Sequence, residues 1–273
     1  MKKALMILAI LAGLILIFIS CEKKVYVVEP DNTPPSSPKG VYSVTGDQAI
    51  YIYWEKNDER DFYRYKIYWA PETDGIIPEP DGNFELITSI PNPPRYTDTD
   101  VSNGKTYYYI ITAVDFSGNE SGNSTMIYDT PRPEGHNYTI FYMQAYPNVS
   151  GFSFDNRTVV RWDNSICDIY LDKPSTILYI NTTKRNGVWN DIQDMGFTYD
   201  LNEITYAPDT GWSELGYVEV IPGHTYVIWT WDYHYAKLRV TYVPDSHDYM
   251  QFEWAYQTAP NNQELKQVPK KPR

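Results

Sequence analysis

Hydrophobic and polar residues alternate along most of the chain. In the first half, between residues 38 and 130, the alternation forms five short runs, at 49–54, 62–69, 84–90, 106–114 and 126–128. Alternation with a period of two places successive side chains on opposite faces of a strand, so Ile50, Ile52 and Trp54 share one face. Pairs of Gly, Asn, Asp and Pro separate the runs. Short strands at this spacing predict an antiparallel β-sandwich.

The second half, residues 137–258, alternates in the same way but with different spacing. Its predicted strands lie at 138–143, 158–162, 167–171, 176–181, 217–221, 224–231, 235–243 and 249–257. We expect Pro222-Gly223 to form the turn of a hairpin and Asp232-Tyr233-His234 to form another. Residues 189–195 are the one candidate for a short helical turn, because no longer segment has the 3.6-residue period of a helix. The pattern predicts an all-β protein with two antiparallel β-sandwich domains.

A different pattern occupies residues 1–20. Lys2 and Lys3 precede an uncharged run from Ala4 to Ile19. This run is shorter than the ~20 apolar residues that a membrane-spanning helix needs. A basic start followed by a short apolar segment is typical of a secretory signal peptide. We therefore expect a signal peptide over residues 1–20, with an uncleaved transmembrane helix as the alternative.

The end of this segment, Phe18-Ile19-Ser20-Cys21, resembles the lipobox of bacterial lipoproteins, although Leu is commoner than Phe at its first position. The resemblance implies cleavage before Cys21 and a covalent lipid, a diacylglycerol plus an N-acyl group such as palmitate, on that residue. It also implies a place in the cell envelope. Glu22 stands where many lipoproteins retained at an inner membrane carry Asp, so the outer membrane is expected, with the leaflet left open. The Pro-rich residues 21–37 would form an extended tether.

Several residues in the first half form a recognisable set. Pro34-Pro35 lie where the family pattern has its first strand ahead, Trp54 ends the run 49–54, which corresponds to the second strand of that pattern, and Asn103-Gly104-Lys105-Thr106-Tyr107 opens the strongest run. In these features residues 38–130 resemble a fibronectin type III domain. The resemblance implies that Trp54 fills the centre between two sheets and that Tyr107 forms a tyrosine corner, its hydroxyl bonded to nearby backbone. Residues 137–258 lack this pattern and are similar only to β-domains of uncharacterised bacterial surface lipoproteins.

Composition and charge limit the function classes. The chain has 273 residues, of which 42% are hydrophobic, and a net charge of −12. This is enough for two packed domains. An acidic protein is a poor partner for nucleic acid, so we expect none. The polar tail, residues 259–273, is predicted to be disordered, with a basic patch for lipid headgroups as the alternative.

The two cysteines are Cys21 and Cys167. If Cys21 carries lipid, Cys167 has no partner within the chain. We expect Cys167 to be a buried free thiol that behaves as a small hydrophobe. The alternative is a disulfide with another molecule outside the cytoplasm.

Catalytic and metal-binding motifs were not found. The chain has no Gly-x-Ser-x-Gly elbow, no His-Glu-x-x-His helix, no phosphate loop and no Cys-x-x-Cys pair. Its four His residues lie near turns or linkers without ligand spacing, so no metal and no cofactor other than the lipid is expected. A carboxylate pair of a glycoside hydrolase is invisible in sequence, and a hydrolase therefore stays an alternative.

The candidate ligand-binding residues are the aromatic residues of one predicted hairpin: Trp229, Trp231, Tyr233 and Tyr235. If exposed, they would form a platform for sugar rings; if buried, they are core. We favour core because the opposite row of the same strand is also largely apolar, and large aromatic residues are mostly buried. The function expected is a non-enzymatic, lipid-anchored binding or adhesion module for a protein or a glycan. Carbohydrate capture for an uptake system is the alternative.

Overall fold

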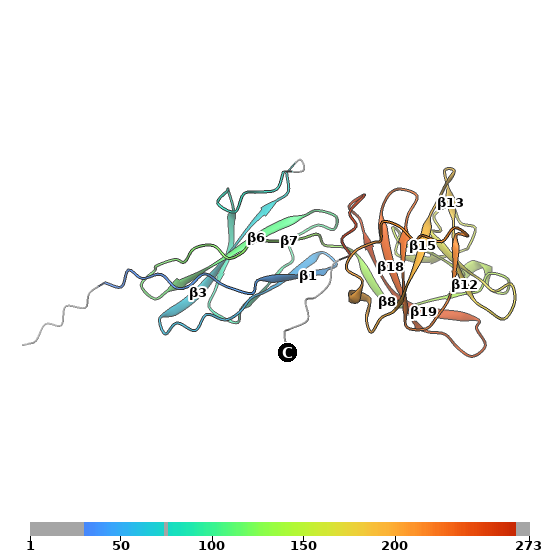
Figure 1. Ribbon diagram of the computed structural model, residues 1–273, viewed down its shortest axis with the longest axis horizontal. Coiled ribbons are helices and arrows are strands. Elements are labelled where there is room, and N and C mark those ends of the chain that lie inside the picture. Colours follow the sequence, from blue (N-terminus) through green and yellow to red (C-terminus); the bar gives the residue numbers. More distant parts are fainter. Residues whose placement is uncertain (1–29, 74–75, 266–273) are drawn as a thin grey trace, which may run out of the picture. The chain divides into compact units, whose positions relative to one another are not determined.

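The computed structural model describes residues 30–73 and 76–265 (Figure 1). This part of the protein is all-β, with two short 3₁₀ helices, η2 (Pro147–Val149) and η3 (Leu201–Glu203). None of its helices has the length and apolar character needed to cross a membrane. The predicted signal peptide and Cys21 lie outside the described residues. We describe strands β1 to β7 as the first domain and strands β8 to β19 as the second domain.

The first domain is a sandwich of two antiparallel sheets. One sheet has the order β1-β2-β5, and the other has the order β4-β3-β6-β7. Their bounds are β1 (Tyr42–Gly46), β2 (Ala49–Tyr53), β3 (Phe62–Pro71), β4 (Glu85–Ile90), β5 (Arg95–Asp98), β6 (Tyr107–Asp115) and β7 (Ile127–Asp129). This three-on-four arrangement is that of a fibronectin type III domain, as the sequence predicts. Strands β1 and β5 were not among the predicted runs, because both are short and rich in polar residues.

The core of the first domain lies between these two sheets. Ile50 and Ile52 of β2 and Tyr65 and Ile67 of β3 are fully buried, and Trp54 is buried with them. The Trp54 ring meets the Tyr65 ring edge to face, with centroids 5.0 Å apart. Burying one such side chain contributes roughly 1.5–3 kcal/mol. Alternation in the sequence therefore identified the inward-facing positions correctly.

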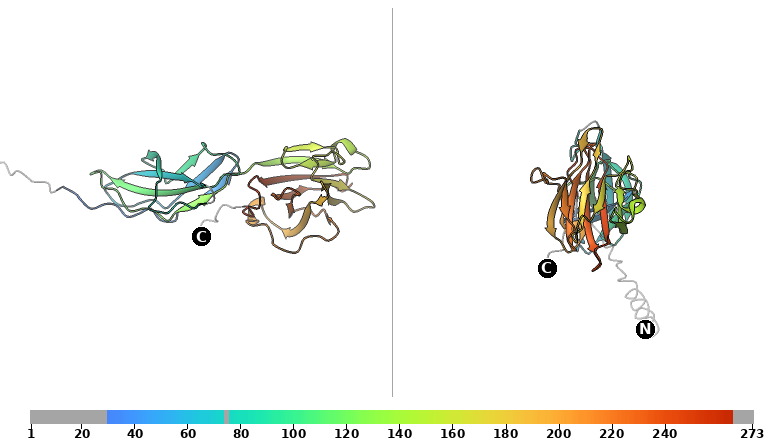
Figure 2. Two further views of the ribbon diagram at one scale, coloured as in Figure 1. Left: turned by 90° about the horizontal axis from the view of Figure 1, so that it is seen from above. Right: turned by 90° about the vertical axis from the view of Figure 1, so that its right-hand side faces the viewer.

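The second domain is also a sandwich, with two five-stranded sheets. Their orders are β10-β9-β11-β12-β16 and β15-β17-β18-β19-β8, and Figure 2 shows them as separate layers. The first sheet contains β9 (Gly151–Ser153), β10 (Thr158–Val160), β11 (Ile169–Asp172), β12 (Tyr179–Thr182) and β16 (Tyr217–Glu219). The second contains β8 (Glu134–Phe141), β15 (Asp191–Phe197), β17 (His224–Trp229), β18 (Tyr235–Tyr242) and β19 (Tyr249–Gln257). A separate hairpin consists of β13 (Lys184–Arg185) and β14 (Val188–Trp189).

Aromatic rings fill the space between the two sheets of the second domain. Phe152 of β9 meets Phe252 and Trp254 of β19, with ring centroids 5.2 Å and 5.4 Å apart. All three side chains are buried. Such offset and edge-on ring pairs add about 0.5–1.5 kcal/mol each beyond their burial. Ring packing therefore joins the two sheets of this domain, without a disulfide among its described residues.

Two local predictions for the second domain were wrong. Pro222-Gly223 does not close a hairpin: β16 pairs with β12, whereas β17 pairs with β15 and β18, so this turn carries the chain from one sheet to the other. Residues 189–195 are not helical but end β14 and form most of β15. The predicted turn at residues 232–234 does join β17 and β18, which pair directly.

Residues 259–265, assigned from sequence to a disordered tail, are ordered. The Ala207 amide donates to the Gln263 carbonyl at 2.9 Å, and the Leu265 amide donates to the Thr205 carbonyl at 2.7 Å. Leu265 is fully buried. The prediction failed because one apolar residue in a polar stretch gives no periodic signal, although its burial is enough to fix the segment. Residues 266–273 lie outside the described part.

Candidate ligand-binding groove

A groove in the second domain is built around the β13–β14 hairpin, which projects from the domain in Figure 1. The two residues between its strands are Asn186 and Gly187, with φ values of 49° and 84°. Two successive residues with positive φ are typical of a type I′ turn, for which Asn-Gly is the preferred pair. The turn sets the register, so that Lys184 lies opposite Trp189.

The base of this hairpin is fixed to the strand layer below it. The Asn190 amide donates to the Thr183 carbonyl at 3.0 Å, and the Thr183 amide donates to the Asp168 carbonyl at 3.1 Å. The buried Asn190 side chain donates from Nδ2 to the Asp168 carbonyl at 2.9 Å and accepts from the Trp231 amide at 2.7 Å. A buried amide with both ends satisfied holds one orientation. The hairpin therefore forms a pre-organised wall of the groove.

Three aromatic rings line the groove, which has a volume of about 280 Å³. Trp162 comes from the loop after β10, Tyr170 from β11 and Trp189 from β14. The Trp162 and Tyr170 rings lie 5.6 Å apart at 50°. Trp189 is 56% exposed, an unusual position for so large an apolar side chain. Polar side chains complete the lining: Asp163, Asn164, Ser165, Thr182, Thr183, Lys184 and Arg185.

Two positively charged side chains face this groove. The Lys184 ammonium lies 5.6 Å from the centre of the Trp189 ring and has no carboxylate partner among the described residues. The Arg185 guanidinium lies 5.1 Å from the Trp231 ring centre, and its Nη2 lies 3.7 Å from Oδ1 of Asp168. Asp163, the one carboxylate in the lining, forms an ion pair with Arg161.

Asp168 lies beneath the groove and is buried. Its Oδ2 accepts a hydrogen bond from the Phe154 amide at 2.8 Å. Burial raises the pKa of the Asp168 carboxyl to about 6, against the opposing effects of that hydrogen bond and of the Arg185 charge. Asp168 therefore changes charge in a pH range in which ordinary carboxylates remain ionised.

Cys167, also part of the lining, is a buried free thiol. Its Sγ donates to the Ile169 carbonyl at 3.1 Å, and burial raises the pKa of the thiol to about 12. The thiolate is the reactive form, and it is suppressed here. The structure thus agrees with the interpretation of Cys167 as a small buried hydrophobe.

The four aromatic residues singled out from the sequence do not form one platform. Trp229 and Tyr235 stack with centroids 5.7 Å apart, and Tyr235 is buried against Leu265 and Ala207. Tyr233, at the β17–β18 turn, is 55% exposed. Trp231 lies apart from them, beneath Arg185. Tyr235 is therefore core, whereas Trp229 is half-buried against the same cluster. A binding role of the four aromatic residues stays a prediction.

The groove aromatics were missed from the sequence because they are scattered. Trp162, Tyr170 and Trp189 lie on three separate segments, and only the fold brings them together. One local signal was present. The Asn186-Gly187 pair between two short β-prone segments is typical of a hairpin turn, and Trp189 lies two positions after Gly187.

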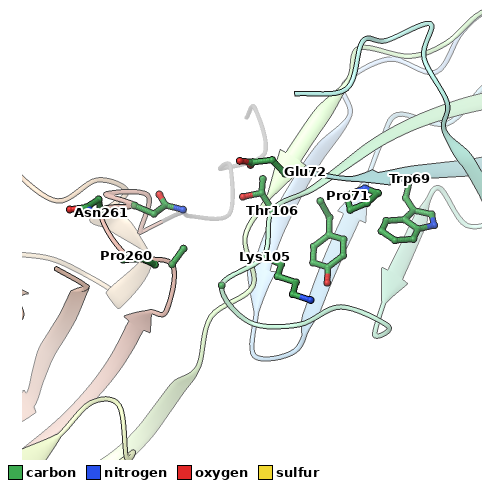
Figure 3. Close-up of a pocket in the computed structure, with 11 residues that line it drawn as sticks. Trp69, Pro71, Glu72, Lys105, Thr106, Pro260 and Asn261 are labelled. Atoms are coloured by element: carbon green, nitrogen blue, oxygen red, sulfur yellow. The ribbon is translucent and has the colours of Figure 1, made fainter. Parts of the chain in front are cut away.

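The two residues expected to be structural occupy the positions that the resemblance implies. Trp54 is in the core, and the Tyr107 hydroxyl accepts a hydrogen bond from the Ser102 amide at 2.9 Å, which makes a tyrosine corner. The Tyr107 ring also packs on Trp69, with centroids 5.6 Å apart. Figure 3 shows Trp69, Pro71 and Thr106 at this end of the domain.

Fold and groove together define an all-β protein with a fibronectin type III-like domain and a second β-sandwich domain. No family model matches the chain. It is 33% identical over 95 residues to an amylopullulanase of Thermoanaerobacter thermohydrosulfuricus, and 33% identical over 91 residues to an amylopullulanase of Thermoanaerobacterium saccharolyticum. These matches cover 35% and 33% of this chain, but only 6% of each relative. The similarity is therefore to a small part of a large enzyme.

Solved structures similar to part of the chain include a Fn3-like protein from Clostridium thermocellum. It is 23% identical, and the match covers 35% of this chain and 92% of that one, with a TM-score of 0.30. A β-1,2-glucanase from Parabacteroides distasonis is 28% identical, over 39% of this chain and 14% of that one, with a TM-score of 0.31.

Proposed function

We propose that this protein is a lipid-anchored protein of the cell envelope that binds a glycan, without catalysis, through the groove beside the β13–β14 hairpin. The observation that carries the proposal is the set of three aromatic rings, one of them the 56% exposed Trp189, in a groove with hydrogen-bonding side chains. Binding sites of this kind combine apolar faces with a few polar groups that fix orientation. A pyranose ring has an apolar face and a hydroxyl edge, and this lining complements both.

The charges in the groove support binding rather than hydrolysis. Most glycoside hydrolases need two carboxyl groups about 5–9 Å apart. The groove lining supplies one, Asp163, which is neutralised by Arg161. The similarity to a small part of amylopullulanases supports an accessory role, because a stretch that is 6% of a large enzyme has the size of an accessory domain.

The lipidated Cys21, the tether and the first domain would hold the groove away from the membrane surface. A lipid on Cys21 would hold the chain at a membrane, and stable anchoring takes more than one acyl chain, as a lipoprotein anchor provides. Residues 35–37 of the predicted tether pack on the first domain, because Pro35 is buried and the Ser36 amide donates to Oε1 of Glu59 at 2.8 Å. The remaining residues 21–34 would extend on the order of 40 Å if they are polyproline-like throughout. The fibronectin type III-like domain then acts as a spacer between the tether and the binding domain.

The test is calorimetric titration of the purified full-length protein with a panel of neutral and acidic polysaccharides. Trp189→Ala should weaken binding at least tenfold, because an exposed Trp is the largest stacking surface in the groove. Its free energy of unfolding should change by less than ~0.5 kcal/mol, since the ring is not part of a core. Tyr199→Ala is the matched control, since Tyr199 is 80% exposed and lies outside the groove lining. Absence of binding to every glycan, or an equal loss in both variants, would refute the proposal.

A further inference from the structure

The charge of the groove is opposite to the charge of the whole protein. The chain carries a net charge of −12, yet the groove lining contains Lys184 and Arg185 against the single carboxylate of Asp163. Asp163 is already paired with Arg161, which does not belong to the lining. A cationic recess on an acidic protein attracts anions to that recess, while the acidic remainder of the surface repels them.

Lys184 has no internal ion pair among the described residues, and Arg185 has only a long one, with the buried Asp168. Lys184 has no carboxylate partner among the described residues, and its ammonium lies beside the ring of the exposed Trp189. Arg185 is 3.7 Å from Asp168, beyond hydrogen-bond distance, and its Nε and Nη2 have no hydrogen-bond partner in the described part of the chain. Arg185 is half-buried, and buried N–H groups that lack acceptors are costly, so an anionic group that accepts from them would relieve that cost.

We infer that the groove selects acidic glycans: a sugar ring stacks on Trp189 while its carboxylate or sulfate group pairs with Lys184, and Arg185 adds the second positive charge. This inference rests on the proposed function and specifies its ligand class. The cross-strand register fixes the geometry, because Lys184 and Trp189 face each other across the hairpin. An ammonium beside an indole ring matches a pyranose that carries a charged substituent at its edge.

A pair of polysaccharides with one backbone tests the inference. Polygalacturonate and its fully methyl-esterified form share one backbone, as do dextran sulfate and dextran, and only the first member of each pair is anionic. We expect the full-length protein to bind at least one anionic member at least tenfold more tightly than its neutral counterpart. The pair that discriminates shows whether the group recognised is a carboxylate or a sulfate.

Variants of the groove complete the test. Lys184→Gln should weaken binding of the anionic glycan about tenfold and leave weak binding of the neutral counterpart unchanged. Trp189→Ala should weaken binding of both. Lys56→Gln removes the same charge at an exposed position of the first domain and should have no effect. Circular dichroism of each variant should match that of the parent, because Lys184 and Trp189 are both exposed.

The outcomes separate the two proposals. Equal affinity for charged and neutral members, with sensitivity to Trp189→Ala, would retain glycan binding and overturn acidic selectivity. If Trp189→Ala and Lys184→Gln leave the affinity for anionic glycans unchanged, the inference is overturned and the binding site lies outside this groove. Stronger binding of a single-stranded oligonucleotide than of any glycan would overturn both, since stacked bases and phosphates could use the same side chains.

Discussion

At the residue scale, Asp168 has an environment that no sequence pattern shows. It follows Cys167 in a segment predicted only as a strand, and its carboxylate is held by the amide of Phe154, which directly follows β9, the strand paired with β11. Trp54 is the opposite case, since alternation and the fibronectin type III resemblance both predicted its burial. Apolar positions can be inferred from local pattern, whereas the burial of a polar residue is decided by tertiary contacts.

The raised pKa of Asp168 leads to a prediction about stability. Because the folded-state pKa is about 6 and the usual value is 3.8, the folded protein holds this proton more tightly than the unfolded chain. Its stabilising contribution is therefore fully present below pH 3.8 and is lost as the pH rises through 6. The rise of about 2 in pKa corresponds to about 3 kcal/mol between these limits.

Asp168→Asn, which does not titrate, should lack this dependence. Urea denaturation of both proteins from pH 4 to pH 7 should show the parent losing about 2 kcal/mol relative to the variant over that interval, because part of the full effect lies below pH 4. A difference between the two proteins that stays constant with pH would contradict the assigned ionisation.

At the element scale, strand existence could be predicted but strand partnership could not. Pro222-Gly223 between two apolar runs looks like a hairpin turn, yet β16 and β17 join different sheets. A two-residue turn indicates that the chain reverses direction. It does not indicate with which strand, or in which sheet, the next strand pairs. The groove illustrates the same limit, because its three aromatic residues come from elements that are neighbours only through sheet β9-β11-β12 and the β13–β14 hairpin.

The segment 259–265 makes a prediction at this scale. Leu265 is buried against Val227 and Tyr235, on the face of β17 and β18 that points away from the main core. The Lys237 ammonium donates to the carbonyls of Ile204 and Leu265 at 2.9 Å each, so the segment closes that face together with η3. Leu265→Ala should lower the free energy of unfolding by ~2–4 kcal/mol through a cavity beneath the segment.

Denaturation in urea, followed by Trp fluorescence, measures this loss, and the Trp229 ring beneath the segment should become more exposed to solvent. Leu86→Ala is the matched control, because Leu86 is 52% exposed and should cost less than ~0.5 kcal/mol. Equal stability of the two variants would mean that the segment contributes nothing to the fold.

At the scale of the whole molecule, the proposed function arranges the tether, the spacer and the groove in one order along the chain. The fold class follows from periodicity, because both domains are sandwiches with alternating faces. The groove cannot be predicted from periodicity, because it depends on where a loop, a strand and a hairpin come together. In the proposed function a lipid anchor would give this order its purpose, because a binding site held at a surface can engage one polysaccharide through many copies at high effective concentration.

This order predicts the behaviour of Cys21→Ser. Without the thiol no thioether-linked lipid can form, so the protein should fail to incorporate labelled palmitate and should leave the membrane fraction. Both domains should still fold, since their cores lie between residues 50 and 113 and between residues 140 and 265. The released protein should bind soluble glycan with the same affinity but should no longer hold polysaccharide at the cell surface. Membrane fractionation with palmitate labelling measures the loss of the lipid anchor, and calorimetry on the released protein measures its affinity for soluble glycan.

Ser20→Ala is the control, because it keeps a small residue before the Cys and should leave lipidation intact. Continued membrane association of Cys21→Ser would show that the apolar run of residues 4–19 is itself the anchor.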